Sequence, residues 1–215
     1  MQVFLTYKTM FKKITLLGVL AVLCLNFSSI AQSPISAIKP NSLSFGDSLS
    51  RTQFGSKGGA LKVGDKLPES FWQQKHTIYA NGQTTKQTLE KYKNTPFILD
   101  FWATWCSTCI YKFSILAQWQ ESTKGQLGIL LVNSSNTKDK EERVAALLEG
   151  KRAPHQQFKL PSVVNDTYLD ALFPHQTLPH YIWIDATGTV SAITNADFVT
   201  LAQLHAFLQT NPTKP

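Results

Sequence analysis

Cysteine is scarce in this chain, which has 3 cysteines among its 215 residues. Cys24 lies inside an apolar N-terminal run, so the rest of the chain holds only Cys106 and Cys109. Two cysteines separated by two residues cannot link distant parts of a fold, which excludes a disulfide scaffold. The pair is therefore either a chemical site or a local clip.

Charge is also low, at 16% of residues, with a formal net charge of +7. Lys8, Lys12 and Lys13 lie in the N-terminal region; the remaining 18 basic and 14 acidic residues leave a mild excess of +4. No run of Lys and Arg is interleaved with aromatic residues, so we expect no nucleic-acid partner. With 43% hydrophobic residues, the composition is that of a globular protein.

No hydrophobic run reaches the roughly 20 residues that a membrane-spanning helix needs. The run from Ile14 to Phe27 has 14 residues, follows a basic start and leads to Ser29-Ile30-Ala31, which has cleavage-site spacing. This pattern predicts a signal peptide over residues 1–31 and export to the periplasm or cell envelope. An uncleaved membrane anchor is the alternative.

Three segments follow the predicted signal peptide. Residues 32–60 are rich in Ser, Gly and Gln and predict a flexible lead-in, whereas residues 211–215 form a Pro-containing tail. Residues 61–210 carry all the periodic patterns and are predicted to form one domain.

Within that domain, hydrophobic periodicity predicts alternating strands and helices. Lys75 to Ala80 alternates and meets Asn81-Gly82, which is the typical signal of a β-hairpin. Predicted strands cover 96–102, 127–132, 181–185 and 190–194, and predicted helices cover 106–120, 138–148, 167–173 and 198–208. This order predicts an α/β fold with a central mixed β-sheet, helices on both faces and an N-terminal β-hairpin extension.

The most informative segment joins the strand 96–102 to the two cysteines. A helical pattern begins at Cys106, so this residue is predicted at a helix N-terminus, where free N–H groups and the helix dipole favour a thiolate. The thiolate is the reactive form of cysteine, and Cys109, one turn away, can resolve a mixed disulfide. The segment predicts a dithiol–disulfide redox site, which requires no cofactor.

Asp100 lies six residues before Cys106, inside the predicted buried strand. A buried carboxylate is costly and usually has a partner or a role. Its side chain is expected to point the same way as that of Trp102, beneath the dithiol, where it could accept the proton of Cys109. The alternative is an Asp that only accepts hydrogen bonds at a strand position.

Pro179 precedes an apolar strand and, taken alone, predicts a turn. His175 and His180 flank it and are interpreted as loop histidines. In the alternative interpretation, His180 lies near the dithiol and stabilises the thiolate or helps to bind Cu(I). A copper-binding or metallochaperone module is therefore the alternative to a redox enzyme.

The run from Trp102 to Cys109, with Asp100 before it and Leu178-Pro179 ahead of the strand 181–185, resembles the thioredoxin superfamily. The lead Val63 to Pro68, the hairpin and the exported context are most similar to its TlpA/ResA-like branch of periplasm-facing thiol–disulfide oxidoreductases. The resemblance covers about residues 61–210 and implies a thioredoxin-like fold.

The resemblance implies that Cys106 is the exposed nucleophile, Cys109 the resolving thiol and Asp100 the buried acid. The expected substrates are protein thiols and disulfides, and a membrane or periplasmic redox partner would recycle the dithiol. Lys112 stands where ResA-like reductases carry a glutamate, and the residues between the cysteines lack the proline common in reducing members. These two departures leave the direction of electron flow open.

The resemblance also implies how a substrate is held. A cis peptide bond before Pro179 would lie beside the dithiol and leave the backbone of Leu178 free to pair with a substrate strand. Trp105 would pack at the edge of the same site.

Overall fold

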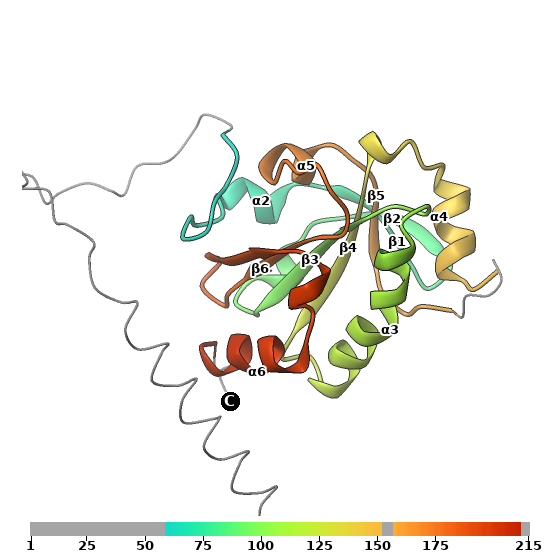
Figure 1. Cartoon of the computed structure of the whole chain (residues 1–215). Coiled ribbons are helices and arrows are strands. Elements are labelled where there is room, and N and C mark those ends of the chain that lie inside the picture. Colours follow the sequence, from blue (N-terminus) through green and yellow to red (C-terminus); the bar gives the residue numbers. More distant parts are fainter. Residues whose placement is uncertain (1–58, 152–156, 212–215) are drawn as a thin grey trace, which may run out of the picture. The chain divides into compact units, whose positions relative to one another are not determined.

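The structure is a computed structural model that describes residues 59–151 and 157–211. The predicted signal peptide, nearly all of the lead-in 32–60 and most of the tail lie outside these ranges. A seven-stranded sheet forms the centre, in the order β2-β1-β5-β4-β3-β6-β7 (Figure 1). The strands are β1 (His76–Ala80), β2 (Gln83–Gln87), β3 (Phe97–Trp102), β4 (Gly128–Ser134), β5 (Ser162–Asp166), β6 (His180–Ile184) and β7 (Val190–Thr194).

The helices connect these strands and lie on both faces of the sheet. The α-helices are α2 (Glu69–Gln73), α3 (Ser107–Ser122), α4 (Glu141–Leu148), α5 (Tyr168–Leu172) and α6 (Leu201–Gln209). The short 3-10 helices in the described part of the chain are η2 (Glu90–Tyr92), η3 (Ser135–Thr137) and η4 (Ala196–Phe198). None of the helices in the described ranges is long and apolar enough to cross a membrane.

The sheet is mixed, as the sequence predicts. Strands β3, β4 and β5 run parallel, whereas β1–β2 and β6–β7 are antiparallel pairs at opposite edges. Asn81 and Gly82 both adopt positive φ, of 52° and 80°, as a two-residue hairpin turn requires. The predicted α/β class with an N-terminal hairpin is confirmed.

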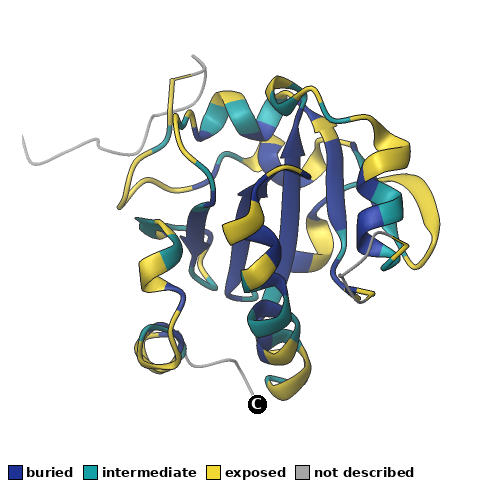
Figure 2. Ribbon diagram, turned by 45° about the vertical axis from the view of Figure 1, so that its right-hand side comes forward, coloured by how far each residue is buried: buried dark blue, intermediate teal, exposed yellow. Residues whose placement is uncertain are grey.

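Side-chain alternation along β3 divides the core into two apolar clusters. Ile98 and Trp102 pack on one face of the sheet with apolar residues of α3, α4 and α6. Phe97, Leu99 and Phe101 pack on the other face with residues of α2 and α5. Figure 2 shows the central strands as buried and the outer sides of the helices as exposed.

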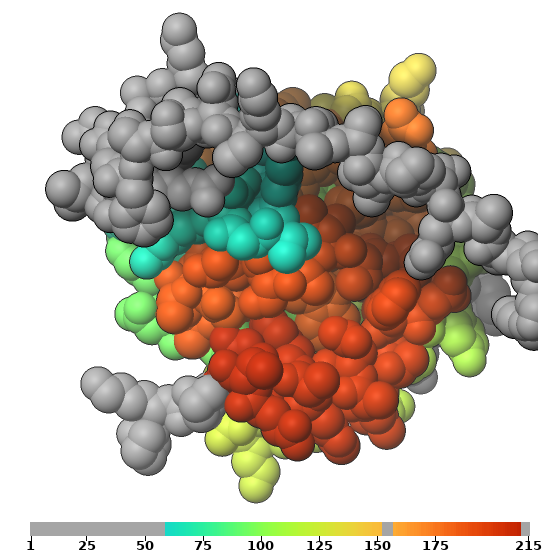
Figure 3. Space-filling model, turned by 60° about the vertical axis from the view of Figure 1, so that its left-hand side comes forward, coloured from blue at the N-terminus to red at the C-terminus, as the bar shows by residue number. Residues whose placement is uncertain are grey.

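The segment before α2 is hydrogen-bonded to the β7 edge of the sheet, which is the edge opposite the β1–β2 hairpin. The N–H of Gly64 donates to the carbonyl of Val190 at 2.8 Å, and that of Leu67 donates to the carbonyl of Gly188 at 2.8 Å. Figure 3 shows this segment, in cyan, lying against the orange and red C-terminal half of the chain.

Two elements were missed by the sequence analysis, which predicted neither α2 nor β5. The predicted helix 138–148 begins only at Glu141, because η3 and a short loop follow β4. The helix predicted over 198–208 likewise begins later, at Leu201, after η4.

Candidate dithiol site

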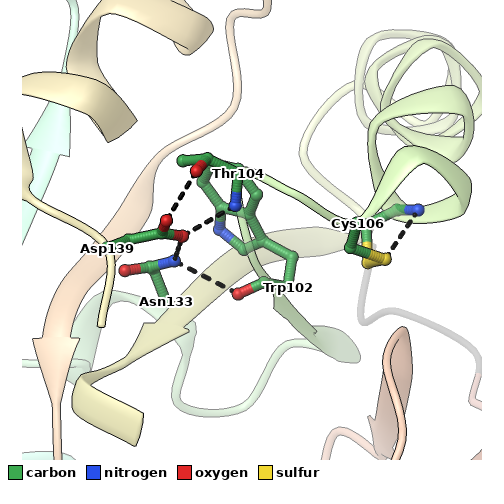
Figure 4. Close-up of a disulfide and its surroundings, with 6 residues drawn as sticks. Trp102, Thr104, Cys106, Asn133 and Asp139 are labelled. Atoms are coloured by element: carbon green, nitrogen blue, oxygen red, sulfur yellow. Dashed lines mark hydrogen bonds between the residues drawn. A yellow bond between two sulfur atoms is a disulfide. The ribbon is translucent and has the colours of Figure 1, made fainter. Parts of the chain in front are cut away.

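The two cysteines lie at the N-terminus of α3 and form a disulfide, with their Cα atoms 5.3 Å apart (Figure 4). Cys106 is the N-cap residue, and its Sγ accepts a hydrogen bond from the N–H of Cys109 at 3.2 Å. The N–H of Cys106 donates to the carbonyl of Ala103 at 3.0 Å. This geometry places the Cys106 sulfur where an anion is favoured by unpaired amide groups and the helix dipole.

The two cysteines differ in exposure. Cys106 keeps 7% of its surface exposed, whereas Cys109 has 0%. Cys106 is thus much less exposed than expected of the nucleophile, because in the disulfide its sulfur packs into the core cluster on the α3 face. Trp105, next to it in the chain, is 62% exposed.

Asp100 is fully buried, and neither of its carboxylate oxygens has a hydrogen-bond partner among the described residues. Ile98 and Trp102, two residues to either side, belong to the same cluster as both cysteines, so the side chain of Asp100 lies on the face of the sheet that carries the dithiol. Burial raises the pKa of its carboxyl well above the ordinary value of 3.8. The predicted orientation of Asp100 agrees with the structure.

Tyr181 lies directly opposite Asp100 in the β3–β6 register. Burial, followed by the nearby Asp100 carboxyl, raises the pKa of the Tyr181 phenol. The Tyr181 hydroxyl also lacks a hydrogen-bond partner in the described part of the chain. No cation relieves this pair among the ion pairs of the described residues, so the neutral form of Asp100 is favoured.

The peptide bond between Leu178 and Pro179 is cis, as the resemblance implies and the residue alone did not predict. Pro179 immediately precedes β6, in which His180 pairs with Phe101 near the end of β3. The cis bond therefore lies near the C-terminal end of β3, where the loop that presents Cys106 begins. Leu178 is partly buried and packs against both apolar clusters.

His180 does not join the sulfurs. As the cross-strand partner of Phe101 it lies on the face opposite α3, where its ring stacks on His175 with centroids 4.9 Å apart. Burial, followed by the charge of His175, lowers the pKa of His180 to about 4, so the imidazole is neutral at ordinary pH. In residues 59–151 and 157–211, no three His, Cys, Asp or Glu side chains form a group that could hold a metal ion.

The sequence analysis missed three polar residues around the loop before Cys106. Thr104, Asn133 and Asp139 form a hydrogen-bonded group beside this loop (Figure 4). A signal existed, because Asn133 directly follows the predicted strand 127–132, and neighbouring parallel strands end at the same side of a sheet. The pairing of Asp139 with Thr104 carries no sequence signal.

No protein-family model matches the chain. The thioredoxin-like protein YneN of Bacillus subtilis is 23% identical over 108 residues, covering 50% of this chain and 61% of YneN. A putative thiol:disulfide interchange protein DsbE from Chlorobium tepidum is 23% identical at a TM-score of 0.51, covering 69% of this chain and 99% of its own. A secreted Mycobacterium tuberculosis disulfide oxidoreductase is 14% identical at a TM-score of 0.50, and the match covers 66% of this chain and 99% of the Mycobacterium chain. At these identities the likeness to the solved structures is one of fold.

Proposed function

We propose that this chain, which has the thioredoxin-like fold that its sequence predicts, is an exported thiol–disulfide oxidoreductase acting on protein substrates. The observation that carries the proposal is the Cys106–Cys109 disulfide, in which Cys106 caps α3 and keeps 7% of its surface exposed whereas Cys109 has 0%. Exchange needs a thiolate on the accessible sulfur and a second thiol within reach. Both conditions follow from the position of the pair on the helix.

In the reducing direction, the Cys106 thiolate attacks one sulfur of a substrate disulfide. The substrate S–S bond breaks, a Cys106–substrate bond forms and the other substrate sulfur leaves as a thiolate. Cys109 then attacks the Cys106 sulfur, which forms the Cys106–Cys109 disulfide and releases the second substrate thiolate. The substrate gains two electrons and the protein dithiol loses two, and the same steps in reverse oxidise a substrate dithiol.

Asp100 supplies the proton acceptor for the second step. Cys109 is inaccessible to water in the disulfide form, so its proton needs an acceptor inside the protein. A carboxyl whose pKa is raised by burial is better matched to a thiol than an ordinary Asp is. The ionised fraction of Asp100, which is a stronger base because burial raises its pKa, accepts the proton as Cys109 attacks, and the proton passes to solvent after product release.

Substrate binding is assigned to the residues that surround the disulfide. Leu178 precedes the first β3–β6 pair, so its backbone lies beyond the ladder and can pair with an extended substrate segment. Pro179 directs that backbone past the dithiol, and exposed Trp105 contacts the substrate from the other side.

Export to the periplasm or cell envelope is proposed from residues 1–31. The basic start, the short apolar run and the small residues at 29–31 support a cleaved signal peptide. In that location a membrane or periplasmic redox partner would return the dithiol to its working state. Fractionation followed by N-terminal sequencing tests this part of the proposal, and a chain that keeps residues 1–31 in the cytoplasm would contradict it.

Cysteine variants test the activity. With an insulin-like protein disulfide as substrate, we expect Cys106→Ser to reduce turnover to the uncatalysed level. Cys109→Ser should instead accumulate a covalent mixed disulfide that dithiothreitol releases. Wild-type turnover no faster than that of Cys106→Ser would contradict the proposal, and tight Cu(I) binding by the reduced but redox-inactive protein would replace it with the copper-binding alternative.

A further inference from the structure

The loop that presents Cys106 is held by a segment with no part in the exchange chemistry. This segment runs from Asn133, near the end of β4, through η3 to Asp139. Figure 4 shows Trp102 and Thr104 between these side chains and Cys106. We call Asn133, Thr137 and Asp139, with their bonds to the loop, the loop brace.

A single carboxylate holds both the backbone and the side chain of Thr104, two residues before Cys106. Asp139 accepts the Thr104 N–H at Oδ2, at 2.7 Å, and the Thr104 hydroxyl at Oδ1, at 2.5 Å. Asn133 Nδ2 donates both to Asp139 Oδ2 at 2.9 Å and to the Trp102 carbonyl at 3.2 Å. These bonds fix the loop in position and orientation.

The brace is itself held in shape. Thr137 accepts the indole N–H of Trp105 at its carbonyl, at 3.3 Å, and donates its own hydroxyl to the Ser134 carbonyl at 2.8 Å. Lys138, directly before Asp139, has a φ of 58°, a left-handed conformation that costs energy for a residue with a side chain. Such a conformation persists where the surroundings impose it, and here it delivers Asp139 to Thr104.

We propose that Asp139 is a positioning residue of the dithiol, which acts through Thr104 to set where the Cys106 sulfur lies relative to the amide groups that begin α3. The inference deepens the proposed thiol–disulfide function and rests on it. Without the brace, the loop from Ala103 to Trp105 is free to shift. The Cys106 thiolate then loses part of its alignment with the helix N-terminus. The reduced form is therefore less stabilised, and the disulfide becomes harder to reduce.

The test measures the protein's own exchange equilibrium with glutathione and the ionisation of Cys106 in the reduced protein. For Asp139→Asn and Thr104→Val, we expect the equilibrium constant to shift about tenfold toward the protein disulfide, which corresponds to about 30 mV. The apparent pKa of Cys106 should rise in both variants. Thr104→Ser keeps the hydroxyl and should restore the wild-type equilibrium.

Glu141→Gln is the control for charge. Glu141 is exposed and two residues from Asp139, so this variant removes a nearby negative charge but leaves the brace intact. Loss of negative charge alone favours the thiolate, which is the opposite direction to the predicted shift. A shift of Asp139→Asn in that direction, or unchanged equilibria in both Asp139→Asn and Thr104→Val, would overturn the proposal.

These measurements concern the Cys106–Cys109 bond and need no protein substrate. A protein that turns over no substrate would therefore refute the proposed function while the brace result still stands. Thr104→Val removes a single hydroxyl from a small side chain. If Asp139→Asn fails to fold, the glutathione equilibrium and the Cys106 pKa of Thr104→Val test the proposal.

Discussion

At the scale of single residues, Asp100 carries a cost that its neighbours do not relieve. Its carboxylate is fully buried, has no hydrogen-bond partner among the described residues and has a pKa raised by burial. In the unfolded chain the same group ionises near 3.8. As pH rises above that value, ionisation stabilises the unfolded state first, so the fold loses stability until the raised folded pKa is passed.

We therefore predict that Asp100→Asn is more stable than the wild type at neutral pH, with a difference that shrinks toward pH 4. The amide cannot ionise, so the pH-dependent loss disappears. Urea unfolding of both proteins across this pH range measures the effect. Asp197→Asn, at an exposed site, should leave the pH dependence of wild type in place.

Asp100→Asn should also resolve mixed disulfides about 100-fold more slowly than the wild type, because a general base contributes at least this much to the rate. The measurement is the rate at which Cys109 releases a substrate attached to Cys106. Equal rates in both proteins would remove Asp100 from the mechanism while leaving its effect on stability intact.

The sequence predicts Cys106, Cys109 and Asp100 as site residues from their local spacing and from the apolar strand around Asp100. It could not identify Asp139, whose partner Thr104 lies 35 positions away. That pairing depends on the left-handed turn at Lys138, and an ordinary Lys gives no sign of such a turn. The cis bond before Pro179 came from the family resemblance and from no property of the residue alone.

At the scale of elements, β4 begins at a glycine that the packing requires. A Cβ at Gly128 would lie 2.5 Å from Cδ1 of Tyr92 and 3.1 Å from Cβ of Phe97. The two rings stack with centroids 5.5 Å apart, so neither can move freely. Gly128→Ala should lower the free energy of unfolding by about 1–3 kcal/mol, the usual range for overpacking, as measured by urea denaturation.

A double-mutant cycle with Tyr92→Leu provides the control. The smaller side chain makes room for the added methyl group, so the cost of Gly128→Ala should fall when Tyr92 is absent. Additive losses would mean that the steric explanation is wrong.

At this scale, segments with a clear local signal were predictable, and α2 and β5 were not. The β1–β2 hairpin combines alternation with a turn pair, and β3 is a nearly continuous apolar run followed by the helical pattern of α3. By contrast, β5 has five residues, follows Pro161 and includes Asn165 at a φ of 53°. Its strand conformation comes from pairing with β1 and β4, which the local sequence does not encode.

At the scale of the whole described unit, the dithiol and the contact between β1 and β5 lie on different faces of the central sheet. Cys106, Cys109 and Trp102 belong to the cluster on the α3 face. His76 of β1 and Asp166 of the neighbouring β5 form a buried contact, with Nδ1 and Oδ1 3.4 Å apart and side chains 2% exposed. This separation allows stability to change without changing the dithiol.

The His76–Asp166 pair holds the hairpin to the rest of the sheet, because β1 and β5 share only two register pairs, Ile78 with Val163 and Tyr79 with Ser162. Asp166→Ala leaves the buried Nδ1 of His76 without this partner, and we expect a loss of about 1–3 kcal/mol in unfolding free energy. Asp166→Asn keeps an acceptor and should lose less. Urea denaturation measures both losses, and the exchange equilibrium with glutathione should stay at the wild-type value. A shifted equilibrium would show that the hairpin edge and the dithiol are coupled, which the packing of the two clusters argues against.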